Sequence, residues 1–430
     1  MAEQNLLEKV VALCKKRGFI FPGSEIYGGL ANTWDYGPLG VELKNNLKRY
    51  WWKTFVQDRD DIYGLDGGIL MNPKIWEASG HTKGFIDTLV ECKKCHNRFR
   101  VDFIGDAKKC PECEGELTEP KKFVPMFKTF IGATEDSASV AYLRPETAQA
   151  IFVNFKNILD SFHPSLPFGI AQIGKAFRNE ITLGNFIFRN LEFEQMEIEY
   201  FIYEKDWEKY FENWKKAMEN WITSLGVKKE NLSWRQHSSE ELSHYSKRTE
   251  DLEYKFPFGV KELYGLAYRT NFDLKNHSQF SGKELIYKDR SGEVFYPHVV
   301  EPSMGVERSA LAILLDSYFE DKERLILKLP PKLAPFKVAV FPLLANKPEL
   351  EKIARGIYDQ LKPVFMTAWD DRGNIGKRYY SQDEIGTPWC VTVDFKSLED
   401  NSVTVRDRDT AKQERIGVDK LTDYFQNLLR

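Results

Sequence analysis

The clearest pattern of apolar and polar positions along the chain lies between Asp206 and Gly226. Large apolar side chains recur there every three or four residues, which places them on one stripe of a helix. Asp206 is suited to cap the first turn of this helix, and Gly226 is suited to end it. A stripe of this kind is typical of a helix packed on a core. It consists of Trp207, Phe211, Trp214, Met218 and Trp221.

Residues 1–18 and 40–56 show the same helical spacing of apolar positions. The first segment also carries Glu3 and Glu8 and lacks a small-residue cleavage site, so we expect an amphipathic helix and not a signal or transit peptide. Residues 62–73 are predicted to form a strand that stops at Pro73. The apolar positions are Leu6, Leu7, Val10, Val11 and Cys14 in the first helix and Val41, Leu43, Leu47, Trp51 and Phe55 in the second.

Period-two alternation marks the middle of the chain, where polar residues occupy the positions of one strand face. Arg178 and Glu180 lie two apart at the end of a strand predicted over 167–180. Residues 181–188 are interpreted as a hairpin loop. The next strand then presents polar and aromatic side chains at the same spacing, namely Phe193, Gln195, Glu197 and Glu199. One face of the sheet should therefore carry an arginine, an aromatic ring, an amide and several carboxylates.

Further strands are predicted over 262–274 and 295–305, followed by a helix over 306–319. Several strands with long connections and few strand–helix–strand repeats favour an antiparallel-rich α+β sheet. Residues 327–336 are proline-rich and predict a linker. Beyond this linker, short apolar strands alternate with helices, which predicts a small α/β domain with a mixed sheet. We find no internal repeat and no low-complexity segment.

Composition narrows the class of protein. The chain has 430 residues, 42% of them hydrophobic, and a net charge of −3, so it is long enough for two or three globular domains. No apolar run approaches the roughly 20 residues that a membrane helix needs. The balanced charge excludes a bulk basic field for nucleic acid, although local clusters of Lys and Arg can still bind phosphates.

Four of the six cysteines form two CxxC pairs separated by 14 residues, within an apparent insertion at about 85–122. Disulfides are not expected in a chain without a secretion signal, and four thiolates at this spacing suit tetrahedral zinc. Such a closed site is structural, because no coordination position remains open for chemistry. The alternative is a ribbon that keeps its thiols reduced and empty. The four residues are Cys92, Cys95, Cys110 and Cys113, while Cys14 and Cys390 are expected to be packing residues.

The polar sheet face suggests a nucleotide site without a glycine-rich phosphate loop, since neither GxGxxG nor GxxxxGK[ST] is present. Arg178 can grip a phosphate, and Phe193 can stack on a base. Arg308 follows the sequence "SMG" at the start of a helix, where anions are favoured. The alternative is a set of solvated or mutually paired charges.

The sequence "FRNE" with Arg189 and Phe193 resembles motif 2 of class II aminoacyl-tRNA synthetases, and "GVER" ending in Arg308 resembles their motif 3. The helix, strand and Pro73 described above resemble motif 1, which builds the dimer interface in that class. The wider set of segments is similar to the homodimeric type of glycyl-tRNA synthetase over nearly the whole chain. The segments are "FPGSEIYGGLANTWDYGPLG", "WEASGH", "LRPETAQ", "FEQME", "EYKFPFG", "EPSMG" and "GKRYYSQDEIGTPWCVT".

This resemblance implies a site for ATP and glycine on the sheet face, with Arg178 and Arg308 as the catalytic residues. ATP-binding positions implied by the resemblance are Arg178, Asn179, Glu180, Phe188, Arg189, Asn190, Leu191, Glu192, Phe193, Glu262, Leu263, Gly305, Val306, Glu307 and Arg308. Glycine-binding positions implied are Arg100, Glu146, Phe193, Glu194, Gln195, Met196, Glu197, Arg269, Glu301, Pro302, Ser303, Met304 and Gly305. Glu262 is a candidate magnesium ligand. For Glu146 the alternative is a strand-end ion pair with Arg144.

The resemblance further implies a class II catalytic domain over 1–330 with a zinc-ribbon-like insertion at about 85–122 and a helical insertion at about 204–255. Residues 336–430 are similar to an anticodon-binding domain. We expect a cytoplasmic homodimer that uses ATP, Mg²⁺, structural Zn²⁺, glycine and tRNA(Gly), with no membrane partner. Two alternatives remain: a non-catalytic, synthetase-like nucleic-acid-binding protein, and a class II synthetase for another small amino acid.

Overall fold

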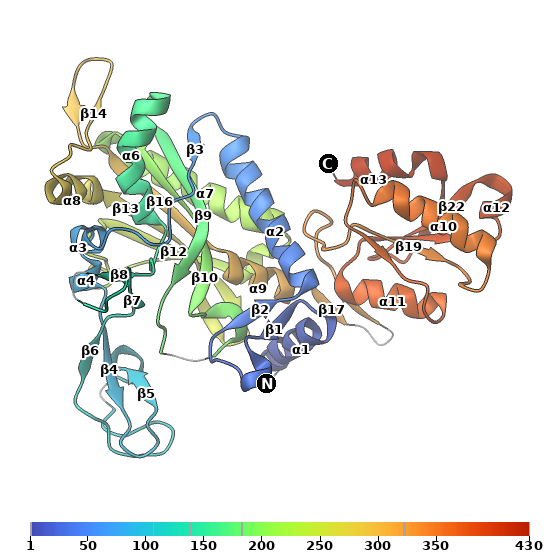
Figure 1. Cartoon of the computed structure of the whole chain (residues 1–430), viewed down its shortest axis with the longest axis horizontal. Coiled ribbons are helices and arrows are strands. Elements are labelled where there is room, and N and C mark those ends of the chain that lie inside the picture. The colour runs from blue at the N-terminus through green and yellow to red at the C-terminus, as the bar shows by residue number, and fades with distance from the viewer. Residues whose placement is uncertain (1, 106, 137–138, 182–183, 321–323, 430) are drawn as a thin grey trace.

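The computed structural model describes residues 2–105, 107–136, 139–181, 184–320 and 324–429, with the side chains of 2–4, 102 and 103 left aside. A large N-terminal part holds a twisted sheet and its helices, and a smaller C-terminal part lies beside it (Figure 1). Within these ranges no helix is long and apolar enough to cross a membrane.

The central sheet has seven strands in the order β11-β12-β13-β16-β10-β9-β3. All neighbouring pairs are antiparallel except β3 with β9, which confirms the predicted antiparallel-rich α+β class. The strands are β3 (Ile62–Gly64), β9 (Phe168–Phe177), β10 (Glu192–Ile202), β11 (Leu232–Gln236), β12 (Arg248–Phe256), β13 (Gly259–Thr270) and β16 (His298–Gly305).

Side-chain alternation along β10 separates the two faces of this sheet. Met196, Ile198 and Tyr200 belong to the main apolar core, together with the helices α1 (Ala2–Arg17), α2 (Pro38–Trp52), α7 (Trp207–Ser224) and α9 (Val306–Ser317). Phe201 lies on the opposite face, in a smaller cluster with α6 (Ala148–Phe162) and α8 (Phe272–Ser281). The helices α6 and α8 cover only one end of that face, so Phe193, Gln195 and Glu197 border an open cavity.

The predicted helices form, with small differences at their ends. Asp206 occupies the N-cap position of α7, but its side chain makes no capping hydrogen bond. Gly226 follows the last turn at φ +91°, a left-handed conformation that glycine adopts without strain. The helix α2 continues as a π-helix over Lys53–Gln57.

Two predicted elements differ from the structure. The strand expected over 62–73 is only three residues long, because the chain leaves the sheet before the pair Gly67 and Gly68, and Pro73 then precedes the short helix α3 (Lys74–Ala78). The segment 204–255, expected to be a helical insertion, contains one helix, α7, and then β11 and most of β12. Both strands extend the central sheet, and the period-two alternation of their residues was the only sequence signal for them.

The cysteine segment projects from the N-terminal part as a small three-stranded sheet (Figure 1). Its elements are β4 (Asp87–Glu91), β5 (Arg98–Arg100), α5 (Val101–Ile104) and β6 (Lys121–Phe123). Shorter elements of the N-terminal part are β1 (Ile20–Pro22), β2 (Trp34–Tyr36), α4 (His81–Gly84), β7 (Lys128–Phe130), β8 (Val140–Tyr142), β14 (Tyr287–Lys288), β15 (Val294–Phe295), β17 (Tyr318–Glu320) and β18 (Leu325–Leu327).

The C-terminal part has a five-stranded mixed sheet in the order β20-β19-β21-β22-β23, as predicted for this region. The proline-rich connector before it is packed: Leu329 and Leu333 are buried in the main core, and Asn46 Nδ2 donates to the Leu333 carbonyl. The elements are β19 (Val338–Pro342), α10 (Pro348–Leu361), β20 (Thr367–Trp369), α11 (Ile375–Ile385), β21 (Trp389–Val393), α12 (Ser397–Asp400), β22 (Ser402–Asp407), β23 (Gln413–Gly417) and α13 (Leu421–Leu429).

Candidate active site

A cavity of about 440 Å³ opens on the polar face of the central sheet. Its floor comes from β10, β13 and β16, and its rim from the β9–β10 connection and from the start of α9. Predicted site residues that line it are Glu146, Arg178, Glu180, Phe188, Arg189, Asn190, Phe193, Gln195, Glu197, Glu262, Leu263, Glu301, Ser303, Gly305, Glu307 and Arg308. Segments more than 150 residues apart in the sequence therefore meet at one site.

One end of the cavity is acidic, and Glu197 lies at its centre. Its carboxylate accepts hydrogen bonds from the Thr147 N–H at 3.1 Å and the Ser303 hydroxyl at 2.7 Å, and from the Thr147 hydroxyl and the Gln195 amide. Burial raises the pKa of Glu197, and the neighbouring Glu146 raises it further. These donors hold the carboxylate in a fixed orientation, and the Arg178 guanidinium is a nearby cation that acts on it through its charge.

Glu146 pairs with a histidine and not with its neighbour in the sequence. His81 Nε2 lies 3.3 Å from Glu146 Oε2, and the Gln149 amide donates to Oε1 at 2.9 Å. Although burial opposes it, the pKa of Glu146 is lowered, chiefly by His81. The expected alternative, an ion pair with Arg144, is wrong. The guanidinium of Arg144 instead donates to the carbonyls of Lys175 and Gly67 at 2.6 and 2.7 Å, because it points along β9.

Arg269, which was expected to bind glycine, lies outside the cavity. It is 1% exposed. Its guanidinium donates to both oxygens of Asp273 at 2.9 Å and to both oxygens of Glu301 at 3.0 Å. With these donors engaged, Arg269 acts on the site by orienting Glu301, whose own carboxylate does line the cavity.

The other end of the cavity is cationic. Arg178 Nε donates to the Pro145 carbonyl at 3.0 Å, which fixes the side chain at the cavity. Arg308 forms an ion pair with Glu262, with 3.0 Å between NH1 and Oε2, and this pairing lowers the pKa of Glu262. Arg189 forms a longer ion pair with Glu180, with 3.7 Å between NH1 and Oε2. Guanidinium groups that converge on one cavity suit a polyphosphate.

Aromatic rings stand beside these arginines. The Arg178 guanidinium lies 5.3 Å from the centre of the Phe193 ring and 5.6 Å from that of Phe85. Arg308 lies 4.5 Å from the Phe188 ring. A flat base that enters between such a ring and a guanidinium plane gains stacking on one side and a cation–π contact on the other.

The remaining predicted residues do not line the cavity, and strand alternation explains most of them. Glu194 faces the opposite side of β10, where Lys44 and Lys48 bind its carboxylate at 2.6 and 2.8 Å. Met196 and Met304 lie in the main core for the same reason. Arg100 pairs with Asp87 in the cysteine segment. The other predicted positions outside the lining are Asn179, Leu191, Glu192, Val306 and Pro302.

Several lining residues were not predicted. His81 ends the quoted segment "WEASGH", so its position in a family motif was a usable signal. His237 and Asp251 form a pair, with 2.8 Å between Nε2 and Oδ2, on β12 and the loop that precedes it. These two residues come from the segment interpreted as a helical insertion, where period-two spacing was the only signal. Phe85, His244 and Tyr245 also line the cavity.

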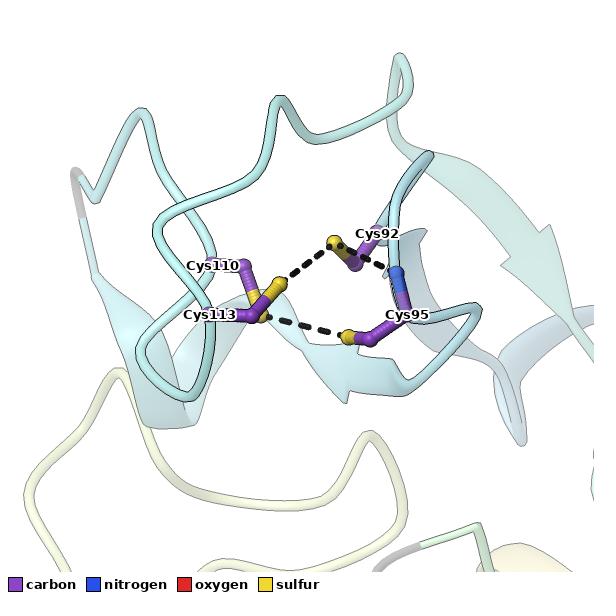
Figure 2. A group of neighbouring side chains, drawn as sticks. All are labelled: Cys92, Cys95, Cys110 and Cys113. Atoms are coloured by element: carbon purple, nitrogen blue, oxygen red, sulfur yellow. Dashed lines mark hydrogen bonds between the residues drawn. The ribbon is translucent and has the colours of Figure 1, made fainter.

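The four predicted cysteine ligands come together in the projecting segment, with their side chains directed toward one another (Figure 2). All four sulfur atoms lie within 4.8 Å of one another, with 3.4 Å between Cys92 and Cys113 and 3.7 Å between Cys95 and Cys110. Four thiolates around a zinc ion at about 2.3 Å would lie about 3.8 Å apart. The N–H groups of Cys95 and Lys94 donate to Cys92 Sγ, which lowers the pKa of that thiol. The donor set therefore fits tetrahedral zinc.

The fold and the site can be compared with known proteins. Residues 130–318 match the model of the tRNA synthetase class II core domain (G, H, P, S and T), and residues 337–428 match the anticodon binding domain. A prolyl-tRNA synthetase from Cryptosporidium parvum has the same fold with a TM-score of 0.68 at 16% identity, covering 98% of this chain and 74% of that one. The molecule is thus a class II aminoacyl-tRNA synthetase, an ATP-dependent enzyme.

Full-length relatives define the family more narrowly. The glycine–tRNA ligase of Alkaliphilus oremlandii is 51% identical over 464 aligned positions, with 100% of both chains covered. That of Caldanaerobacter subterraneus is 50% identical, with 99% of this chain and 98% of the relative covered. That of Treponema denticola is 51% identical, with 95% and 94% covered. The chain belongs to the glycine–tRNA ligase family, which confirms the resemblance inferred from its motifs.

Proposed function

We propose that the chain activates glycine with ATP in this cavity and transfers the glycyl group to the 3′ end of tRNA(Gly). One observation carries the proposal: a single cavity has buried carboxylates at one end and converging arginines at the other. An amino acid and a nucleoside triphosphate have the complementary charges. Family membership supports the choice of glycine.

At the acidic end, the substrate ammonium group lies against Glu146, Glu197 and Glu301. Each of these carboxylates is already oriented by protein donors, so little rearrangement is needed on binding. Glycine has no side chain to grasp, and selectivity must come from excluding a methyl group. The side chains around Glu197 and Ser303 are joined by hydrogen bonds. They cannot move aside for a methyl group without breaking several of these hydrogen bonds.

At the cationic end, Arg178, Arg189 and Arg308 bind the phosphates, and Phe193 or Phe188 stacks on the adenine. Glu262, with Asp251 beside it, offers the carboxylate oxygens that Mg²⁺ prefers. Magnesium bound there would neutralise phosphate charge. The ion pair between Arg308 and Glu262 must then exchange for contacts to nucleotide and metal.

In the first step, an oxygen of the glycine carboxylate attacks the α-phosphorus and pyrophosphate leaves with the bonding electrons. In the second, the terminal 3′-hydroxyl of tRNA attacks the carbonyl carbon, loses its proton, and AMP leaves. Positioning and stabilisation of phosphate charge are the main contributions of the protein. We assign no side chain as a general base.

The remaining assignments follow the division of the fold. Residues 1–330 form the catalytic unit in this proposal, and 336–430 bind the anticodon arm of tRNA. Zinc at Cys92, Cys95, Cys110 and Cys113 stabilises the projecting segment. The reduced cysteines suit the cytoplasm.

A homodimer would cover an exposed apolar loop of the N-terminal region. Ile26 and Tyr27 are each 89% exposed and Leu30 is 60% exposed, although the loop is otherwise ordered by backbone hydrogen bonds. Exposed apolar groups of this kind mark interfaces. Sedimentation velocity of the wild type and of Ile26→Asp would test this assignment, and a monomeric wild type would contradict it.

Amino-acid-dependent exchange of pyrophosphate into ATP tests the central proposal. The purified chain is assayed with glycine, alanine, serine, proline and threonine, with and without tRNA. We expect exchange with glycine alone. Comparable exchange with alanine or serine would instead identify a synthetase for another small amino acid, and no exchange with any amino acid would favour a non-catalytic nucleic-acid-binding protein.

A further inference from the structure

Glu199 extends the acidic face of β10 beyond the cavity. Its side chain is 0% exposed, and neither carboxyl oxygen has a hydrogen-bond partner among the described residues. It does not line the cavity, so it cannot touch a bound substrate. An isolated buried carboxyl group is rare in proteins, because an ionised group without partners is strongly disfavoured there.

The strand register shows what this group faces. β10 and β16 are antiparallel, with Glu197 opposite Ser303 and Tyr200 opposite Val300. Glu199 therefore lies opposite Glu301, and cross-strand neighbours point to the same face of the sheet. Two carboxylates at such positions repel each other unless one of them carries a proton.

Among the residues that the structure describes, Arg269 is the cation whose charge acts on Glu199. On its remaining side β9 places Ile170 opposite Glu199, and α6 covers the face with apolar rings such as Phe152. β13 contributes Arg269, and the carboxyl groups nearby are Glu301, Glu197 on β10 and Asp273 on α8. Because Arg269 binds both oxygens of Asp273 and of Glu301, no guanidinium hydrogen bond reaches Glu199.

We propose that Glu199 is a positioning residue of the amino-acid site, held as a neutral acid so that Arg269 stays bound to Glu301. The carboxylate of Glu301 then remains fixed toward the substrate ammonium group. This inference rests on the proposed function of the cavity. If Glu199 lost its proton, its charge would compete with Glu301 for Arg269 and disturb the orientation of a group that lines the cavity.

The direction of the pH dependence follows. Burial and the nearby Glu301 raise the pKa of Glu199 well above its ordinary value, so the group keeps its proton to a higher pH than an exposed glutamate does and ionises as the pH rises further. Glycine binding should weaken at alkaline pH for this reason. It weakens also because the substrate ammonium group loses its proton, but that loss is the same for every variant.

Glu199→Gln keeps the shape and removes the ionisation. The KM for glycine in pyrophosphate exchange is measured for wild type and variant from about pH 6 to about pH 9. At neutral pH we expect the two KM values to agree within about twofold, and the ratio of wild-type to variant KM to rise with pH. The KM for ATP should be unchanged. Glu301→Gln serves as the comparison that raises the KM for glycine at every pH.

Thermal melting without substrates gives an independent readout. A carboxyl group with a raised pKa in the folded state loses its contribution to stability as the pH rises through that pKa. The melting temperature of Glu199→Gln should therefore exceed that of the wild type by a margin that grows with pH. This experiment does not depend on glycine being the substrate, so it separates a failure of this inference from a failure of the proposed function.

Three results would overturn the inference. The first is a rise in KM at neutral pH as large as that of Glu301→Gln, since Glu199 would then act as an anion. The second is a set of pH profiles for KM and melting that run parallel in the two proteins. The third is failure of Glu199→Gln to fold, because a neutral amide should replace a neutral acid.

Discussion

Arg178 and Arg308 are held in place by the protein before any nucleotide binds. One carbonyl fixes Arg178 through its Nε, while Arg308 lies between the Phe188 ring and the Glu262 carboxylate. Donors oriented in this way need little reorganisation when charge develops on a phosphate. The two side chains differ in one respect: in the proposed ATP complex Arg308 would exchange its ion pair with Glu262, whereas Arg178 forms no ion pair with a described residue.

Arg178→Ala and Arg308→Ala should each abolish most adenylate formation while the fold remains intact. Loss of one group that stabilises transition-state charge costs about 10²–10³ in rate. Glycine-dependent pyrophosphate exchange measures the loss, and circular dichroism checks the fold. Lys156→Ala is a matched control, because Lys156 is an exposed cation on α6 that pairs only with Asp160. Exchange near the wild-type rate in either arginine variant would contradict the assignment of the cationic end.

Glu197→Gln should weaken glycine activation strongly while ATP binding persists. The variant keeps the size of the side chain but removes the charge that faces the substrate ammonium, and it presents a donor to Ser303 and Thr147. Hydrogen bonds to charged groups contribute about 1.5–3 kcal/mol, so the KM for glycine should rise by about ten- to a hundredfold. Binding of ATP, followed by fluorescence or calorimetry, should change little. An unchanged KM for glycine would show that the acidic end does not hold the ammonium group.

At this scale, strand alternation in the sequence was sufficient to predict Phe193, Gln195 and Glu197 as members of one surface. It was insufficient for Arg269. This residue has the charge needed to bind a carboxylate, but its guanidinium already forms ion pairs with Asp273 and Glu301. Such pairing depends on which distant strands become neighbours. His81 was missed for the same reason: its partner Glu146 lies 65 residues further along the chain.

At the scale of elements, a buried ion-pair network joins α2, β10 and α9. Lys44 Nζ lies 2.6 Å from Glu194 Oε2 and 2.7 Å from Glu307 Oε1, and the Glu194 N–H donates to the other oxygen of Glu307 at 2.9 Å. Glu307 immediately precedes Arg308, so this network fixes the first turn of α9 against the sheet. The side chain of Lys44 is only 11% exposed, which limits screening by water.

Lys44→Met should destabilise the protein by about 3 kcal/mol, because removing one partner leaves buried charges uncompensated. It should also raise the KM for ATP, since the turn that carries Arg308 becomes less constrained. Chemical denaturation and exchange kinetics measure the two effects. Lys53→Met is the control: Lys53 is 57% exposed and pairs with Asp58, so its loss should cost at most about 0.5 kcal/mol. Equal stability of the two variants would contradict this role of the network.

The cysteine segment predicts one zinc ion per chain. Metal analysis of the purified protein should find it, and Cys110→Ser should release it. Hydrogen exchange over 85–122 should then accelerate while the central sheet stays protected, because the segment has little apolar core of its own. Cys14→Ala, which removes a buried thiol remote from this cluster, should retain the metal. A metal-free preparation with four titratable thiols in the segment would contradict the zinc assignment.

The prediction of helices and strands succeeded where the periodic pattern of apolar residues extended over many residues. It failed where that pattern covered only a few residues. The helix α7 carries five turns of repeating aromatic side chains, and its position was predicted to within a residue or two. β11 has five residues with mixed exposure, and its place at the sheet edge depends on pairing with β12. A strand that short lacks a signal strong enough to separate it from a loop.

At the scale of the whole molecule, side chains of the N-terminal and C-terminal parts contact each other directly, in addition to the covalent connection between the two parts. Arg324 NH1 donates to Asp383 Oδ2 at 3.0 Å, and Arg17 Nε lies 2.6 Å from Glu384 Oε2. Ile385 at the end of α11 belongs to the main core of the catalytic domain. The prolines of residues 327–336 predict a linker, whereas the leucines among them are buried in the main core, which composition alone does not reveal.

Deletion of residues 336–430 should damage aminoacylation far more than pyrophosphate exchange. The proposed adenylate site lies wholly within residues 81–308, whereas the deleted domain is proposed to bind the anticodon arm. Some loss of stability is expected in both assays, because the contacts of Ile385 and Asp383 are removed. The ratio of the two activities is therefore the measurement. Equal loss of both in a folded, dimeric truncation would contradict the anticodon assignment.

The strand order of the central sheet also determines the stage of synthesis at which the sheet can be completed. β16 lies between β13 and β10, and it is the last of the seven strands to leave the ribosome. Until residue 305 has emerged, the chain holds two separate half-sheets, β11-β12-β13 and β10-β9-β3, each with an unpaired edge. A chain truncated before residue 305 would lack the complete site. It would also expose two unpaired strand edges that can bind other chains. Translation to the end of this one strand therefore separates an aggregation-prone fragment from a closed catalytic sheet.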